Sequence, residues 1–163
     1  MSDHPSNHGP LRIGVISDTH GLLHPKVPGI FEGVEHILHA GDIGPASIVM
    51  QLEKLAPVTA VLGNNDFGLN YQETERIRLA DRDFFVRHIV DVHAPHEWLL
   101  GLTAPKPDVV VFGHSHKPHN QMVGDTLFLN PGYAGKPRFN LSRSVAILQC
   151  HAKEMQVSFV PLD

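Results

Sequence analysis

Three short apolar segments in the first 62 residues constrain what this chain can fold into. Residues 11–17 (LRIGVIS), 36–40 (HILHA) and 58–62 (VTAVL) are brief and rich in aliphatic side chains, as buried strands are. The segments between them, 25–34 and 45–55, read as helices, although Pro and Gly near the middle of the first weaken it. Strands that alternate with helices predict a parallel sheet with right-handed crossovers.

The second half of the chain follows another pattern. Residues 75–79 and 84–87 flank Asp81-Arg82-Asp83, which predicts a hairpin. A helix is expected at 95–102, and further strands at 108–112, 126–129, 144–149 and 155–160. The predicted fold class is therefore α/β, a sandwich of two mixed β-sheets packed face to face, with helices outside.

Length and composition narrow the class of protein. We expect a flexible leader over residues 1–10 and a single domain over 11–163, because 163 residues suit one domain. A net charge of −4 argues against a broad basic surface for nucleic acid. No apolar run reaches the roughly 18 residues of a membrane helix. A polar first segment and a lone cysteine favour a cytoplasmic protein with no membrane association.

Polar residues follow the predicted strands at their carboxyl ends. The first strand runs into Asp18-Thr19-His20, the second into Gly41-Asp42, and the third into Gly63-Asn64-Asn65-Asp66. Two later segments end in Arg87-His88 and in Gly113-His114-Ser115-His116. Because sites in open α/β sheets form outside the carboxyl ends of the strands, we expect these residues at one edge.

The side chains in this set indicate a metal centre. They comprise two carboxylates, one amide and four imidazoles, which are too many for one four-coordinate zinc and suit two ions. Imidazole ligands favour Mn, Fe, Co, Ni or Zn over Mg or Ca. The sequence therefore predicts two divalent transition-metal ions, with manganese as the first candidate.

The order of these motifs resembles that of the calcineurin-like metallophosphoesterase superfamily, and in particular its small single-domain bacterial and archaeal phosphodiesterase branch. The similarity covers nearly the whole chain from residue 11 onward. It rests on a strand-final His and on Asp18-x-His20, Gly41-Asp42, Gly63-Asn64-x-Asp66, Gly113-His114-Ser115-His116 and Asn130-Pro131-Gly132 with Pro137-Arg138 downstream.

This resemblance implies two adjacent metal sites. The implied ligands of one ion are Asp18, His20 and His116, those of the other are Asn64, His114 and a strand-final His, and Asp42 bridges the two ions.

Two histidines compete for the strand-final position. His88 ends the second hairpin strand, seven residues after Asp81, and His93 lies five residues further on. The turn of a hairpin sets its register, which favours His88. A strand that reached His93 would need about nine residues, longer than the usual five or six. His88 is therefore the predicted ligand, and His93 is the alternative.

The predicted activity is hydrolysis of phosphodiesters by in-line attack of a metal-bridging hydroxide on phosphorus. Asn65 stands where, in the larger phosphatases of the superfamily, a His serves as phosphate contact or acid. Without that acid, esters with leaving groups that need little protonation are favoured, which means diesters over alkyl monoesters. Asn65 and Arg138 are the candidate catalytic residues, as contacts to the phosphate.

The expected partner is a small-molecule phosphate ester, with nucleic acid only as a substrate, and a homodimer is compatible with the sequence. The retromer subunit that shares this fold is similar too. A non-catalytic metal-binding scaffold or regulatory protein is therefore the alternative to an enzyme. Every implied metal position here carries a competent residue type, which favours the enzyme.

Overall fold

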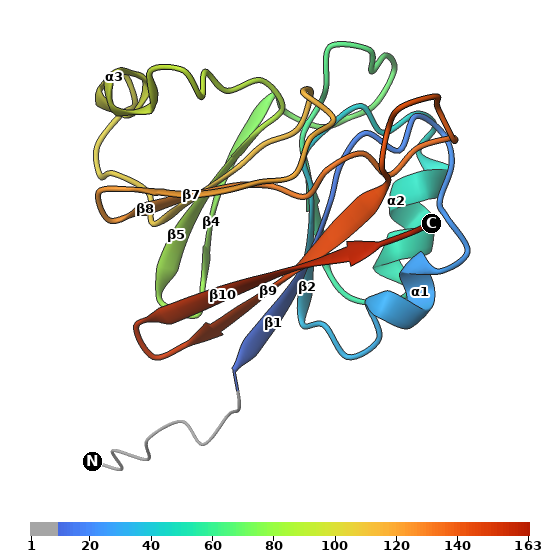
Figure 1. Cartoon of the computed structure of the whole chain (residues 1–163), viewed down its shortest axis with the longest axis horizontal. Helices are drawn as coiled ribbons and strands as arrows, with labels where there is room; N and C mark the ends of the chain where they lie inside the picture. Colours follow the sequence, from blue (N-terminus) through green and yellow to red (C-terminus); the bar gives the residue numbers. More distant parts are fainter. Residues whose placement is uncertain (1–9) are drawn as a thin grey trace.

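Two mixed five-stranded β-sheets pack face to face in the computed structural model, which describes residues 10–163 (Figure 1). The strands of the first sheet, in spatial order, are β10 (Glu154–Pro161), β9 (Ser144–His151), β1 (Leu11–Ile16), β2 (His36–His39) and β3 (Val58–Ala60). Those of the second are β4 (Thr74–Leu79), β5 (Arg82–Arg87), β6 (Val109–Val111), β8 (Thr126–Asn130) and β7 (His119–Val123). The predicted sandwich is confirmed.

Each sheet contains three neighbouring parallel strands. In the first sheet β1, β2 and β3 run parallel, with β3 at one edge; β9 is antiparallel to β1, and β10, at the other edge, is antiparallel to β9. In the second sheet β5, β6 and β8 run parallel, and β4 and β7 form antiparallel edges. The carboxyl ends of these parallel strands point to one end of the molecule (Figure 1).

Three hydrophobic layers hold the sheets and helices together. The central layer fills the space between the sheets, with Val15 and Leu38 facing Phe84 and Val111. Two helices, α1 (Val27–Ile30) and α2 (Ser47–Glu53), cover the outer face of the first sheet. The third, α3 (Pro95–Leu100), lies against the outer face of the second sheet. Alternation along β1 contributes to two layers, because Ile13 and Val15 belong to the central layer and Ile16 to the layer under α1 and α2.

A glycine in β1 lets the first helix approach the sheet. Gly14 lies on the outer face of β1, between the inward-facing Ile13 and Val15. A Cβ at this position would lie 3.0 Å from three atoms of the Phe31 ring, which is fully buried just after α1. The ring fills the space that a side chain would take, and this seats the segment between β1 and β2.

Some local expectations differ from the structure. Strand β7 has no counterpart among the predicted strands, because its residues HNQMV are polar and mostly exposed, as suits an edge strand. The expected helix at 25–34 is only four residues long, consistent with the Pro and Gly within it. The hairpin turn is Ala80-Asp81, both with positive φ, and β5 begins at Arg82. This is the geometry of a two-residue hairpin turn.

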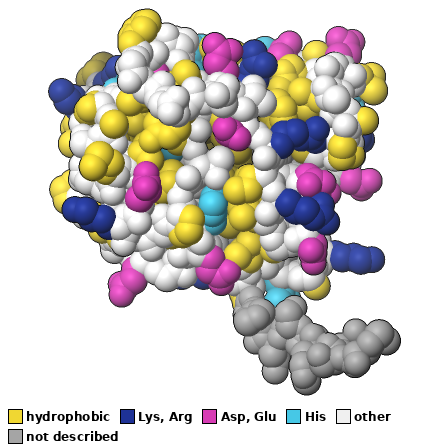
Figure 2. Space-filling view, turned by 180° about the vertical axis from the view of Figure 1, so that it is seen from behind, with side chains coloured by type: hydrophobic (Ala, Val, Ile, Leu, Met, Phe, Trp, Pro, Cys, Tyr) yellow, Lys and Arg dark blue, Asp and Glu magenta, His cyan; other side chains and the backbone are white. Residues whose placement is uncertain are grey.

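The predicted flexible leader lies outside the described residues, apart from Pro10, and the single domain over 11–163 stays a prediction. Among the described residues, no helix has the length and apolar character to cross a lipid bilayer. On the face in Figure 2, acidic and basic side chains are interspersed, with no continuous basic area in view.

Candidate metal centre

Loops that follow five strands meet at one end of the sandwich and carry the predicted ligands. They come after β1, β2 and β3 in the first sheet and after β5 and β6 in the second. The residues that they bring to this end are Asp18, His20, Asp42, Asn64, His88, His114 and His116.

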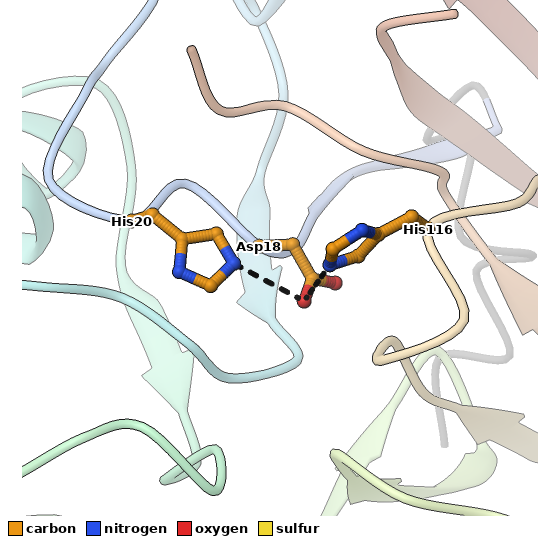
Figure 3. Close-up of side chains that lie close together, drawn as sticks. All are labelled: Asp18, His20 and His116. Atoms are coloured by element: carbon orange, nitrogen blue, oxygen red, sulfur yellow. Dashed lines mark ion pairs between the residues drawn. The ribbon is translucent and has the colours of Figure 1, made fainter. Parts of the chain in front are cut away.

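One group of donor atoms forms around Asp18. Its Oδ1 lies 3.3 Å from His116 Nε2 and 3.8 Å from His20 Nε2, and the two rings point at it from opposite sides (Figure 3). Donors that are each about 2.0–2.2 Å from one ion lie about 3–4 Å from each other. The spacing of these three atoms therefore fits a common metal ion.

A second group shares the same carboxylate. His88 Nε2 lies 3.3 Å from Asp42 Oδ2 and 3.8 Å from Asp18 Oδ1. Asp42 Oδ2 is also 3.7 Å from His20 Nε2, so both carboxylates lie within 4 Å of the His20 and His88 nitrogens. The structure thus has two candidate Asp/His metal-binding groups side by side, with Asp18 common to both. The bridging role expected of Asp42 stays a prediction.

Several of these donor atoms have no partner in the protein. Asp18 Oδ1, His20 Nε2 and His88 Nε2 are buried and make no hydrogen bond. A buried polar atom without a partner costs about 1–3 kcal/mol, and more when it is charged. A cation bound between these three atoms would give each of them a partner. The donor set therefore fits divalent metal ions.

A backbone carbonyl fixes the orientation of His88. Its Nδ1 lies 2.8 Å from the carbonyl oxygen of Ala40, which can only accept, so Nδ1 donates. In this tautomer Nε2 carries the lone pair, and it is the nitrogen that faces Asp18 and Asp42. Such a bond to the far nitrogen is typical of metal-binding histidines, because it sets both the tautomer and the ring orientation.

Asn65 keeps Asp42 ionised. Its backbone N–H donates to Asp42 Oδ1 at 2.9 Å, and its side-chain amide donates to Oδ2 at 3.0 Å. Burial alone would raise the pKa of Asp42, but these bonds and the nearby His88 and His20 hold that pKa below its usual value. The carboxylate therefore presents a negative charge to the second group.

Left-handed backbone conformations occur at most of the predicted ligands. A positive φ costs a residue other than glycine about 1–2 kcal/mol. Five of the seven predicted ligands adopt it: Asp18 (57°), His20 (47°), Asp42 (55°), His114 (70°) and His116 (63°). The loops are therefore held in conformations that the local sequence alone does not favour.

Two residues without a role predicted from the sequence hold these loops. The carboxylate of Asp66 accepts hydrogen bonds from the N–H groups of Ile43, Gly44 and Gly63, and so joins the loops after β2 and β3. The amide of Asn130 donates to the carbonyl of Gly113 and to Ser115 Oγ, which anchors the loop after β6. Both belong to motifs that carry the family resemblance, and that membership is the signal for them in the sequence.

Three histidine or asparagine residues considered in the sequence analysis lie outside the two donor groups. Asn64 is exposed and borders, with His88, a small cavity of about 130 Å³. The exposed His114 has its ring centroid 5.2 Å from that of His88, and its backbone N–H donates to Asp18 Oδ2 at 3.1 Å. His93 is exposed, and neither donor group includes it.

The ring of Tyr133 lies between Arg138 and His116, a member of the first donor group. Its guanidinium carbon is 5.3 Å from the centre of the Tyr133 ring, and that ring is 4.7 Å from the ring of His116. Tyr133 itself is buried, whereas Arg138 is exposed. The arrangement leaves a positive charge at the rim of the site.

Close packing of Gly63 against Asp42 makes a testable prediction. A Cβ on Gly63 would lie 2.1 Å from Asp42 Oδ1 and 2.2 Å from its backbone nitrogen, so Gly63→Ala must displace that carboxylate. We expect the variant to lose at least one bound ion, measured by elemental analysis after Mn²⁺ loading. Gly29→Ala is the matched control, because a Cβ at position 29 would meet open space. Full metal content in Gly63→Ala would contradict the geometry.

The chain matches the model of the calcineurin-like phosphoesterase superfamily domain over residues 11–153. It is 35% identical over 163 residues to a probable metallophosphoesterase of Methanothermobacter thermautotrophicus, covering 92% of each chain. It is 31% identical over 145 residues to the phosphodiesterase MJ0936 of Methanocaldococcus jannaschii, covering 75% of this chain and 83% of that protein.

Solved structures show the same fold. A novel archaeal phosphodiesterase superposes with a TM-score of 0.75 and 27% identity, over 91% of this chain and 99% of the other. Vps29 of Entamoeba histolytica, complexed with Zn²⁺, gives a TM-score of 0.72 at 22% identity, over 93% of this chain and 99% of the other, a likeness of fold alone. With the family match along the chain and the Asp/His groups at its strand ends, this protein belongs to the calcineurin-like phosphoesterase superfamily and is a metallophosphoesterase, a hydrolase.

Proposed function

We propose that this hydrolase cleaves phosphodiesters by in-line attack of water on phosphorus at a centre of two divalent transition-metal ions, with Mn²⁺ as the first candidate. The observation that carries the proposal is the convergence of Asp18 Oδ1, His20 Nε2 and His88 Nε2, which are buried without partners. When bound, such ions supply Lewis-acid stabilisation of developing charge and make water nucleophilic near neutral pH.

The protein's part is to hold donors of the right kind and charge. Asp18, His20 and His116 would hold one ion, and Asn64, His88 and His114 the other, with Asp42 between them. Asp18 and Asp42 together carry two negative charges, and the histidines bind as neutral rings. Two divalent ions therefore leave the site positive, and a phosphate group is attracted to it.

Asn65 and Arg138 are our candidates for residues around the phosphate. The side-chain amide of Asn65 donates to Asp42, so it orients that carboxylate at the edge of the site. The exposed guanidinium of Arg138 above Tyr133 is a bidentate donor that suits the non-bridging oxygens of a phosphate. The second N–H of the Asn65 amide and the Arg138 guanidinium would then be the donors that stabilise charge on the phosphate oxygens during the attack.

The residue at position 65 also favours diesters. An amide has no titratable proton to give to a departing alkoxide. Esters whose leaving groups need little protonation should therefore react faster. The cytoplasmic location, the small-molecule substrate, the restriction of nucleic acid to a substrate role and a homodimer stay predictions.

Hydrolysis of an activated diester tests the proposed function. Protein stripped of metal with a chelator and then reloaded with Mn²⁺ should release 4-nitrophenol from bis(4-nitrophenyl) phosphate, whereas the stripped protein should not. The reloaded protein should act at least about tenfold more slowly on the monoester 4-nitrophenyl phosphate, which is one decade in the rate constant. Metal-loaded protein with no turnover of either ester would favour a scaffold over an enzyme.

Substitution of the competing histidines tests the ligand assignment. His88 is 3% exposed and aims Nε2 at both carboxylates, whereas His93 is exposed. His88→Ala should lower diester hydrolysis more than about 100-fold, because loss of even an outer partner of a metal ligand costs 10- to 100-fold. His93→Ala should stay within a factor of about two of the parent protein. Metal content measured in parallel should fall only in His88→Ala, and the reverse pattern would move the ligand to position 93.

A further inference from the structure

A fully buried histidine that belongs to neither donor group lies beneath the site. His39 ends β2 and has no exposed surface. The backbone N–H of Gly41 donates to its Nδ1 at 3.1 Å. Since Nδ1 accepts that bond, the ring proton of the neutral imidazole is on Nε2, which lies 3.0 Å from Thr19 Oγ1. Local hydrogen bonds therefore determine both the tautomer and the orientation of this ring.

The hydrogen bonds continue beyond the ring. The Thr19 hydroxyl donates to the backbone carbonyl of Ile43 at 2.8 Å and accepts from His39 Nε2. The resulting chain runs in one direction, from the N–H of Gly41 through His39 and Thr19 to Ile43. It begins one residue before Asp42 and ends one residue after it.

The same chain reaches the first donor group. Thr19 lies between Asp18 and His20, so its side chain anchors the backbone that carries both. Backbone bonds join the same loops, from the N–H of Asp18 to the carbonyl of Gly41 and from that of His20 to the carbonyl of Asp42. His39 thus fixes the neighbours of three predicted ligands, all three of which have a positive φ.

The surroundings keep the ring neutral. Burial is the main cause that lowers the pKa of His39 to about 3, and nearby His88 adds to this while Asp42 opposes it. A neutral ring has one donor and one acceptor, and the two bonds use both. The chain of hydrogen bonds is therefore complete at neutral pH without a counter-charge.

We propose that His39 is a positioning residue, which holds Asp18, His20 and Asp42 in their metal-binding conformation before any ion arrives. This inference rests on the metal centre described under the proposed function. It implies that the fold, rather than the metal, stabilises the left-handed loops. Loss of the ring should then weaken metal binding more than it weakens the fold.

The same strand provides a matched control. His36 begins β2, at the end away from the donor groups, and its Nε2 lies 2.8 Å from Thr59 Oγ1. It therefore makes the same kind of His–Thr bond as His39 but borders no predicted ligand. Substitutions at position 36 report the cost of losing such a bond in β2 without an effect on the loops.

Two substitutions separate the two bonds of His39. In His39→Asn, the side-chain oxygen can take the place of Nδ1 and keep the bond from Gly41. In His39→Gln, the longer amide can take the place of Nε2 and keep the bond to Thr19. His39→Leu removes both, and Thr19→Val breaks the chain from the other side. His36→Asn, His36→Gln and His36→Leu are the controls.

The main readout is Mn²⁺ affinity, measured by calorimetric titration of metal-free protein, with thermal melting of the same metal-free samples. We expect His39→Leu to bind about 10- to 100-fold more weakly, the range for outer partners of metal ligands, and Asn and Gln to lie between it and the parent. Thr19→Val and His39→Asn should be non-additive, because both break one chain. At saturating Mn²⁺ the variants should recover kcat with KM unchanged.

A second readout does not depend on metal or on turnover. In metal-free protein, long-range ¹H–¹⁵N spectra should show His39 with its proton on Nε2 and Nδ1 unprotonated. If His39→Leu does not fold, the Asn and Gln variants still distinguish the two roles, and a spectrum with the proton on Nδ1 would overturn the hydrogen-bond chain on which the proposal rests.

Unchanged Mn²⁺ affinity in folded His39 variants, whatever their loss of melting temperature, would show a merely structural residue and overturn the proposal. Because binding is measured without substrate, failure of diester hydrolysis would overturn the proposed function and leave this result intact.

Discussion

The rest of this structure depends on two carboxylates that are buried close together at one end of the sandwich. Asp18 and Asp42 are almost without exposed surface, and both lie within 4 Å of the same imidazole nitrogens. Like charges taken out of water repel each other and lose their hydration. Hydrogen bonds from Ser17, His114 and Asn65 offset part of that cost. The remaining unpartnered atoms point into one space, which is why a cation belongs there.

The strand arrangement and contacts between loops bring these side chains together. Parallel strands in both sheets end at one edge, so loops far apart in the chain meet there. Polar contacts also hold the loops, with Asp66 between two of them and Asn130 beneath a third. Glycines at positions 63 and 113 leave no room for a side chain next to the carboxylates. The metal-binding conformation is therefore built into the protein itself.

Much of this arrangement is readable from the sequence, because the strands are apolar and the ligands follow them. The predicted ranges of the buried strands β1, β2 and β8 agree with the structure almost to the residue, whereas the polar edge strand β7 has no hydrophobic signal. Strand ends indicate where ligands gather, but not their backbone conformation. The sharing of Asp18 between two groups and the hydrogen-bond chain through His39 depend on distances between loops. Sequence spacing carries no such information.

The central claim is that Asp18 and Asp42 together hold two adjacent metal ions. Anomalous diffraction from crystals grown with Mn²⁺ tests it most directly, since the peaks locate each ion without reference to the protein atoms. The account predicts two peaks about 3.5–4 Å apart, one beside His20 and His116, the other beside His88, with Asp18 and Asp42 between them. A single peak with tetrahedral coordination, or two peaks remote from Asp42, would contradict it.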